Sequence, residues 1–279
     1  MSSVTIGDGV TSIGQEAFYG CSSLLSLTMG DGIVSIGEGT FYNCSSLTSI
    51  NIPDGVISIG EYAFYNCSSL KSVYMTDLSA WCKLVFVSSY SSPLCYGAKL
   101  YMNDQELIEL VIPEGITRIN DAFSGCSSLA SVTIGDDVVS IGSDAFSGCS
   151  SLASVTIGDG VISIGLDAFS DCSSLASVTM GDGVVSIGVD AFSGCSSLAS
   201  VTIGDGVIAI DEDAFSGCFS LKDFYCYAAT PPSICYNYGY SFPKKGYDVK
   251  TILHVPKECV TEYQSSDWAS YFKTIVEME

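Results

Sequence analysis

The sequence predicts a repeat solenoid built mainly of short β-strands with few short helices, and three observations support this prediction. The stretch SLASVTIGDGVISIGLDAFSDCS, residues 151–173, recurs almost verbatim with a period of 23 residues. Its first apolar residues alternate with polar ones, as in a half-buried strand. Gly158-Asp159-Gly160 then reads as a turn. A fixed period of this length is typical of a solenoid, because one turn cannot bury its apolar side alone.

Within one turn, the elements follow in a fixed order. The strand pattern of Leu152, Val155 and Ile157 comes first, with its last three residues alternating, and the Gly-Asp-Gly turn follows, where we expect glycine to supply positive φ angles. A second short apolar segment ends at Gly165, and an Ala-Phe pair fills the third side of the turn. The residues predicted to point inward are Leu152, Val155, Ile157, Val161, Ile164, Ala168, Phe169 and Cys172.

Two apolar residue types recur at equivalent positions, so we expect each to lie above its own copy. The phenylalanines are Phe18, Phe41, Phe64, Phe123, Phe146, Phe169, Phe192 and Phe215. The cysteines are Cys21, Cys44, Cys67, Cys126, Cys149, Cys172, Cys195 and Cys218. A row of cysteines at the end of each turn is most simply a row of buried small apolar side chains with free thiols. Disulfides between stacked neighbours are the alternative, since their Cα atoms come within range.

The acidic residues also form two rows, and the formal net charge is -21. One row lies in the turn after the strand (Asp8, Asp31, Asp54, Glu114, Asp136, Asp159, Asp182, Asp205), and the other precedes the Ala-Phe pair (Glu16, Asp121, Asp144, Asp167, Asp190, Asp213). The simpler interpretation is turn chemistry and solubility; the alternative is weak calcium binding between neighbouring carboxylates. The acidity argues against nucleic acid and anionic membranes as partners. No apolar run approaches the ~18 residues that would insert into a membrane.

The repeat is interrupted once, because the repeat leucines Leu70 and Leu107 are 37 residues apart. This enlarged turn, 70–106, predicts a short helix near 76–82 capped by Thr76 or Asp77, a polar loop over 88–93, a strand over 99–102 and a turn at 103–104. Two interpretations remain open for its aromatic residues. Either Trp81 and Phe86 patch the core, or a projecting loop presents aromatic side chains to a partner. The candidates for such a contact are Trp81, Tyr90, Tyr96 and Tyr101.

The copies differ mainly at one position after the Ile-Gly pair, which is Ser143, Leu166, Val189 or Glu212. We expect this position to be exposed. It is either unconstrained or an interaction stripe, and in the second case Leu166 and Val189 are further candidate contacts.

We predict one solenoid over 1–221 and a capping segment over 222–279 that continues it. In that segment 251–256 reads as a strand, 258–263 and 266–272 as short helices, and the tyrosine-rich stretch 236–247 as irregular. Trp268, Phe272, Ile275 and Val276 are expected to cover the last turn. The chain starts in mid-repeat without a signal peptide, so its first strand predicts an uncovered edge and some self-association.

The sequence of the repeats resembles that of the BspA-like bacterial leucine-rich repeat family, also called the Treponema pallidum type. Ile52-Pro53-Asp54-Gly55-Val56, Ile112 to Ile116 and the run Ala63 to Leu70 carry it, and the likeness covers nearly the whole chain. The resemblance implies a right-handed leucine-rich-repeat superhelix. It also implies a cell-surface or secreted protein that binds host proteins or serves adhesion.

No catalytic motif accompanies the repeats, so we expect no enzyme, cofactor or metal site. His254 reads as structural, because it lies beside Val255-Pro256 in a strand pattern. The function predicted is therefore a non-catalytic protein-interaction scaffold. The alternatives are a structural spacer that displays another domain, and a weak calcium-dependent binding module.

Overall fold

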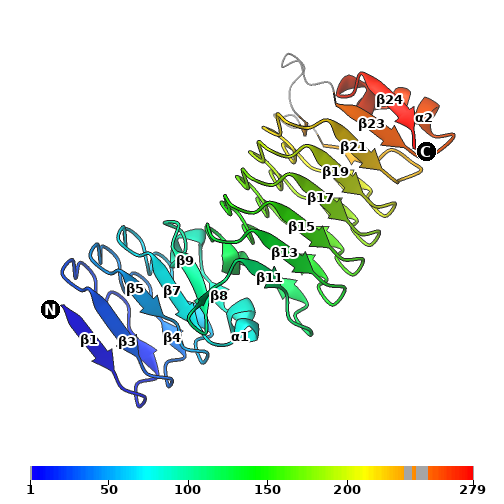
Figure 1. Cartoon of the computed structure of the whole chain (residues 1–279). Coiled ribbons are helices and arrows are strands. Elements are labelled where there is room, and N and C mark those ends of the chain that lie inside the picture. The colour runs from blue at the N-terminus through cyan, green and yellow to red at the C-terminus, as the bar shows by residue number, and fades with distance from the viewer. Residues whose placement is uncertain (1, 236–240, 243–250, 279) are drawn as a thin grey trace. The chain divides into compact units, whose positions relative to one another are not determined.

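A computed structural model describes residues 2–235, 241–242 and 251–278, and it is a parallel β-solenoid with few helices (Figure 1). The predicted fold class is thereby confirmed. The chain divides into two compact units. Unit 1 comprises residues 1–108 and 119–128, and unit 2 comprises residues 109–118 and 129–279.

In unit 1, one strand of each turn joins a main sheet in the order β1-β3-β5-β7-β9-β10. These strands are β1 (Ser3–Ile6), β3 (Ser26–Met29), β5 (Ser49–Asn51), β7 (Ser72–Met75), β9 (Lys99–Met102) and β10 (Gln105–Glu106). A second sheet takes two residues from each turn, in β2 (Ser12–Ile13), β4 (Ser35–Ile36), β6 (Ser58–Ile59) and β8 (Val85–Phe86). Strand β1 is an edge strand, and self-association through it stays a prediction.

Unit 2 repeats this plan. Its main sheet contains β11 (Glu109–Val111), β13 (Ser131–Ile134), β15 (Ser154–Ile157), β17 (Ser177–Met180), β19 (Ser200–Ile203), β21 (Asp223–Cys226), β23 (Ile252–Val255) and β24 (Thr274–Glu277). The second sheet runs through β14 (Ser140–Ile141), β16 (Ser163–Ile164), β18 (Ser186–Ile187), β20 (Ala209–Ile210) and β22 (Ser233–Ile234). The short strand β12 (Arg118–Ile119) contains one residue of each unit.

The core is built by stacking each residue on its own copy. The register pairs Val155 with Val132 on one side and with Val178 on the other. The phenylalanine rings stack in the same way, with centroids 5.2 Å apart for Phe146 and Phe169 and an interplanar angle of 6°. This spacing follows from strands that pair ~4.8 Å apart. The predicted phenylalanine row is confirmed within each unit.

The cysteine row is buried as predicted. Seven of its eight members are fully buried, and Cys21 of the first turn is half-buried. Five of these thiols also have a polar role, because each donates a hydrogen bond to a phenylalanine carbonyl of the preceding turn; they are Cys44, Cys67, Cys172, Cys195 and Cys218. The thiol of Cys172, for example, lies 3.2 Å from the carbonyl oxygen of Phe146.

The Gly-Asp-Gly turn corrects one expectation. Gly158 and Gly160 lie outside the left-handed region, so backbone freedom is not why glycine stands there. A Cβ atom at Gly158 would meet a carboxylate oxygen of Asp136, and one at Gly160 would meet the Asp136 carbonyl. The turns stack so closely that no side chain fits between them. Glycine is therefore required by packing between neighbouring turns.

Left-handed residues occur instead on either side of the Ala-Phe pair. The residue before the pair has φ between 54° and 57° in most copies, as at Asp144, Asp190 and Asp213. Asp121 lacks this conformation, because the copy that contains it is one residue shorter and closes its turn as the 3-10 helix η2 (Asp121–Phe123).

The enlarged turn folds as predicted in its main parts. Asp77 caps helix α1 (Leu78–Lys83) by accepting the N–H groups of Ser79 and Ala80. The polar loop contains the 3-10 helix η1 (Ser89–Ser91). A turn at Asn103-Asp104, both with positive φ, then reverses the chain from β9 into β10.

The C-terminal segment adds two parallel strands, β23 and β24, to the main sheet of unit 2. In the sequence, helix α2 (Val260–Gln264) and the 3-10 helix η3 (Asp267–Ser270) come between these two paired strands. Trp268 and Phe272 are buried as expected, whereas Ile275 and Val276 belong to β24. Most of the tyrosine-rich stretch 236–247 lies outside the described residues. Among those that are described, no helix is both long and apolar enough to cross a membrane.

Candidate functional site

The clearest break in the repeat pattern is a group of tyrosines in unit 1. Its first three copies place a tyrosine directly after the phenylalanine, at Tyr19, Tyr42 and Tyr65. The later copies have serine there, at Ser147, Ser170, Ser193 and Ser216. The three rings form a stack, with centroids 4.9 Å apart for Tyr19 and Tyr42 and 5.0 Å apart for Tyr42 and Tyr65. The 23-residue period therefore builds a row of phenols on the outside of the turns.

Three more tyrosines extend this row. Tyr62 and Tyr90 stack with centroids 5.9 Å apart, and both meet Tyr65 edge to face at 5.8 Å. Tyr96 approaches Tyr65 edge to face at 6.5 Å, and its hydroxyl oxygen accepts the N–H of Asn66 at 2.8 Å. The enlarged turn thus places Tyr90 and Tyr96 against the repeats instead of projecting them away. We call the set Tyr19, Tyr42, Tyr62, Tyr65, Tyr90 and Tyr96 the tyrosine surface.

The tyrosine surface is open to solvent. Tyr19 and Tyr90 are each 52% exposed, Tyr96 43% and Tyr62 38%. Tyr62 also occupies the left-handed position before the Ala-Phe pair, with φ of 54°. A bulky side chain in this region is uncommon, and such backbone strain concentrates at functional sites. Exposed aromatic residues held by their neighbours are typical of contact surfaces, because tyrosine combines a large apolar area with little conformational freedom.

The repeats that carry most of the tyrosine surface contain acidic side chains but no basic ones. Residues 1–70 contain no Lys, Arg or His, and their acidic residues are Asp8, Glu16, Asp31, Glu38, Asp54 and Glu61. Glu61 precedes Tyr62, and its negative charge is the main cause that raises the pKa of the Tyr62 hydroxyl above its ordinary value. The side chain of Glu16 lies over Gly39, because a Cβ atom at Gly39 would be 3.3 Å from Cγ of Glu16 and 3.9 Å from Cβ of Tyr42. The phenol rings and carboxylates therefore share one surface.

Of the residues predicted as contacts, only Tyr90 and Tyr96 belong to the tyrosine surface. Tyr101 lies on the outward face of β9 and stacks on Tyr74 of β7 at 5.0 Å. Leu166 is 46% exposed and Val189 is half-buried, and both belong to unit 2. They do share one row of equivalent positions, because the backbone carbonyls of Leu166 and Val189 accept N–H groups of the preceding turn in the same way.

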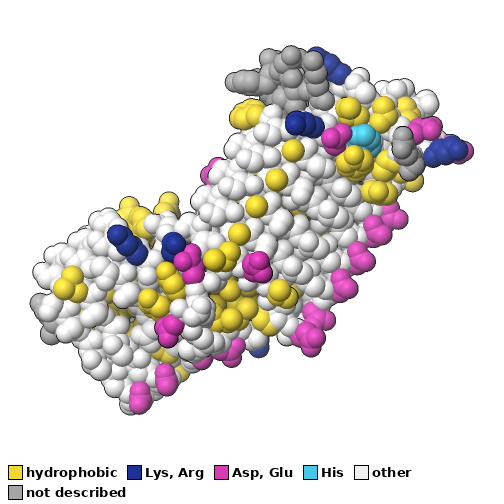
Figure 2. All heavy atoms as spheres, viewed as in Figure 1, with side chains coloured by type: hydrophobic (Ala, Val, Ile, Leu, Met, Phe, Trp, Pro, Cys, Tyr) yellow, Lys and Arg dark blue, Asp and Glu magenta, His cyan; other side chains and the backbone are white. Residues whose placement is uncertain are grey.

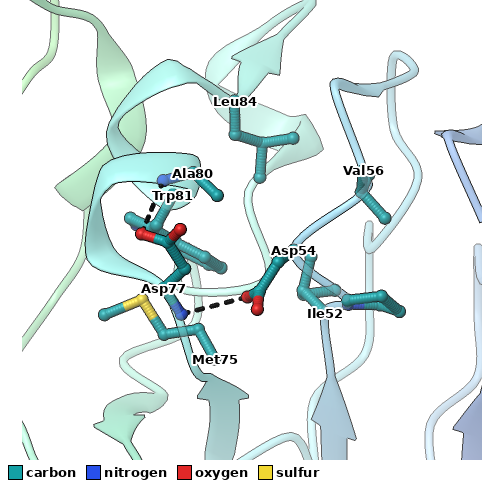
Figure 3. A pocket seen from close by; sticks show the side chains of 9 residues that line it. Ile52, Asp54, Val56, Met75, Asp77, Ala80, Trp81 and Leu84 are labelled. Carbon is teal, nitrogen blue, oxygen red and sulfur yellow. Dashed lines mark hydrogen bonds between the residues drawn. The ribbon is translucent and has the colours of Figure 1, made fainter. Parts of the chain in front are cut away.

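Trp81 does not present its ring to solvent, which corrects the projecting-loop interpretation for this residue. It is 3% exposed, and its indole N–H donates to the Ala122 carbonyl at 2.9 Å. Figure 3 shows Trp81 beneath Asp77, whose backbone N–H donates to the Asp54 carboxylate. The hollow lined by these residues has a volume of about 10 Å³, which is the limit for one water molecule. Trp81 belongs to the core, together with the buried Phe86.

Sequence reasoning missed Tyr19, Tyr42, Tyr62 and Tyr65. The signal was present, because the first three copies read Phe-Tyr where the later copies read Phe-Ser. The packing of the inserted segment on these rings joins residues far apart in the sequence, so no local pattern reveals it.

The turn acids have a structural role. The Asp159 carboxylate accepts the backbone N–H of Asp182 at 3.1 Å, and Asp136 accepts that of Asp159 at 2.9 Å. The missing side chain of each following glycine leaves room for the carboxylate. Figure 2 shows acidic side chains in a row along the edge of unit 2 where strands β13 to β19 end. Within the described residues, no cluster of three or more His, Cys, Asp or Glu is placed to hold a metal ion.

His254 lies on the outward face of β23 and contacts two residues of the neighbouring strand. Its Nε2 lies 2.9 Å from the Asp223 carboxylate, and its ring stacks on Tyr225 with centroids 4.3 Å apart. Both partners come from the neighbouring strand β21. A cross-strand pair of this kind ties one turn to the next.

These observations define a leucine-rich-repeat solenoid, and comparison with known proteins identifies the family of its repeats. The model of the BspA type leucine rich repeat region matches residues 1–91 and 96–222 in six copies. The chain belongs to this family. No curated protein matches the sequence.

Several solved structures are similar. A leucine-rich repeat protein from Bacteroides ovatus is 22% identical, with a TM-score of 0.54 over 100% of this chain and 84% of that chain. A leucine rich cell surface protein from Faecalibacterium prausnitzii is 26% identical, with a TM-score of 0.49 over 81% and 79% of the two chains. The T. pallidum leucine rich repeat protein is 26% identical, with a TM-score of 0.30 over 76% and 72%. Proteins of this repeat class generally serve as protein-interaction scaffolds and are typically not enzymes.

Proposed function

We propose that this protein is a non-catalytic scaffold at the cell surface or outside the cell, which binds proteins, including host proteins, through the tyrosine surface. The single observation that carries the proposal is the cluster formed by the exposed Tyr62, Tyr90 and Tyr96 around the half-buried Tyr65, to which both the repeats and the insertion contribute. Such a cluster offers apolar area that is already ordered, so a partner loses little side-chain entropy on binding. Membership of the BspA type leucine rich repeat family supports the location.

The test exploits the serine that unit 2 carries at the equivalent position. The variant Tyr19→Ser, Tyr42→Ser, Tyr65→Ser gives unit 1 the surface of the later copies without touching the buried phenylalanines. The full chain is immobilised and screened against purified extracellular-matrix and host cell-surface proteins. We expect a partner that the triple variant binds at least about tenfold more weakly, since aromatic contacts at a hot spot are worth 2 kcal/mol or more.

A matched control is Ser147→Thr, Ser170→Thr, Ser193→Thr in unit 2, which changes the same positions and should leave binding unaltered. A partner that binds wild type and the tyrosine variant equally would show that another surface makes the contact. The absence of any partner in the screen would instead favour the spacer function.

A further inference from the structure

This inference rests on the proposed function and concerns the chemistry of the partner that the tyrosine surface binds. The tyrosine surface combines three features that together favour a cation. It exposes phenol rings, it carries Glu16, Glu38 and Glu61 in the same turns, and the first 70 residues hold no basic side chain that could neutralise these carboxylates. We propose that the tyrosine surface binds an arginine-containing segment of a partner protein.

The position of the carboxylates supports this inference. Glu61 and Tyr62 are adjacent, and the charge of Glu61 reaches the Tyr62 hydroxyl. Glu16 and Glu38 belong to neighbouring turns and are joined by the hydrogen bond from the N–H of Glu16 to the carbonyl of Glu38 at 2.8 Å. Both side chains are exposed. The lysines of unit 1 begin at Lys71, and Lys99 is already paired with Glu106 at 3.0 Å.

Arginine fits this surface better than the other charged residues. Its guanidinium group is planar and weakly hydrated, and it stacks on aromatic rings while its N–H groups pair with carboxylates. Tyr62 and Tyr90 expose ring area beside Glu61, so one guanidinium can contact a ring and a carboxylate together. An acidic segment would instead place like charges against Glu16, Glu38 and Glu61. The net charge of -21 also attracts a basic partner from a distance.

The close spacing of the rings points to an extended segment and not to a small molecule. The tyrosine rings lie 4.9 Å to 6.5 Å apart, centroid to centroid, so they fill the space between them and form an outer surface. The stacked rings of Tyr19, Tyr42 and Tyr65 repeat every 23 residues, and each of their turns also carries one glutamate, at Glu16, Glu38 or Glu61. An extended peptide with basic residues at intervals is the partner that meets such a row.

The experiment measures binding of short fluorescent peptides to the full chain by anisotropy. The peptides alternate arginine, lysine or glutamate with glycine and serine, and each is tested at low and at physiological ionic strength. We expect the arginine peptide to bind most tightly and the glutamate peptide not to bind. The double variant Tyr62→Ser, Tyr90→Ser should weaken the arginine peptide about tenfold, in keeping with cation–π and stacking contacts.

The triple variant Glu16→Gln, Glu38→Gln, Glu61→Gln should weaken the arginine peptide by a similar factor. The matched control Glu109→Gln, Glu114→Gln, Glu277→Gln removes the same charge from exposed positions of unit 2 and should leave affinity within about threefold, because distant charges are screened. Thermal melting of each variant confirms that the fold is intact.

Each result has a defined meaning. Equal weakening by the two glutamate variants would show that the peptide senses only net charge, and it would overturn the inference. So would an arginine peptide that binds the tyrosine variant as well as wild type. If a partner found in the protein screen depends on the tyrosines but not on Glu16, Glu38 and Glu61, the cationic chemistry is wrong while the proposed function stands.

Discussion

At the scale of single residues, the structure gives aspartate and glycine a joint role in the turn. Asp159 lies where the Gly181 side chain would be, and its carboxylate accepts the N–H of Asp182. The sequence indicated a turn but not this cooperation, because the partner of each aspartate lies 23 residues away. Local rules for turns describe neighbours in sequence and so cannot detect it.

We therefore expect Asp159→Ala to lower the free energy of unfolding by about 1 kcal/mol, the usual net value of one hydrogen bond. Asp159→Asn keeps an oxygen acceptor and removes one charge from a row of like charges. It should cost less than about 0.5 kcal/mol or be stabilising. Urea denaturation measures both changes. Equal losses for the two variants would mean that the charge, and not the acceptor, stabilises the turn.

At the same scale, the backbone conformation of Tyr62 is unusual for an aromatic residue. Tyr62 takes a left-handed position that Asp144, Asp190 and Asp213 occupy in other copies. Aspartate tolerates this conformation better than an aromatic residue. A sequence comparison of the copies reveals the substitution, whereas its backbone cost is visible only in the structure.

At the scale of elements, the acids that precede the Ala-Phe pairs of unit 2 form a partly buried row. Burial raises the pKa of Asp144, and the charge of Asp167 adds to the effect. Burial is also the main cause that raises the pKa of Asp190, while a hydrogen bond from Ser193 opposes it. The folded state thus holds these protons more tightly than the unfolded chain does.

The consequence for stability has a definite sign. A carboxyl group with a raised folded pKa destabilises the fold progressively as the pH rises from its ordinary value of 3.8 through the folded pKa. Lowering the pH from neutral toward that folded pKa should therefore raise the melting temperature. The variant Asp144→Asn, Asp190→Asn should melt higher than wild type at neutral pH and depend less on pH. Thermal melts across this pH range test this, and a variant that melts lower at neutral pH would contradict it.

The inserted element shows what sequence can and cannot predict. Its helix and its strand over 99–102 follow from local signals and were predicted correctly, and of the two predicted caps, Thr76 and Asp77, the structure has Asp77. The burial of Trp81 depends on the Ala122 carbonyl, 41 residues further along the chain. No local pattern carries that information, so its surroundings could only be seen in the structure.

At the scale of the molecule, the thirteen cysteines are distributed over almost every turn, and their side chains differ in how far they are exposed to solvent. Burial raises the pKa of Cys67 and of Cys82 to about 12, and that of Cys44 to about 11. Cys235 is exposed. Since the thiolate is the reactive form, the buried thiols should be inert in the native protein.

We expect a thiol reagent to modify Cys235 first and the buried cysteine row only after unfolding. Peptide mapping by mass spectrometry identifies the sites, and Cys235→Ser should remove the fast phase. Rapid modification of Cys172 in the native protein would show that the turns open far more often than their packing implies.

The fold class, the inward residues and the cysteine row were predictable because, in a solenoid, residues one sequence period apart contact each other in neighbouring turns. The tyrosine surface was only partly predictable, since Tyr90 and Tyr96 were recognised but their partners in the repeats were not. Periodicity predicts which residues stack, but it does not predict where an interruption of the period will pack.

The register in unit 2 also bears on how such a gene changes. Ser154 pairs with Ser177 and Val155 with Val178, so a strand faces the same residues whichever copy precedes it. Unequal recombination that deletes or duplicates 23 codons would rejoin closely similar surfaces and replace most buried contacts by equivalent ones. Copy number can therefore change in this part of the chain while the stacking is kept, whereas the irregular segment that presents Tyr90 cannot be shortened by the same route.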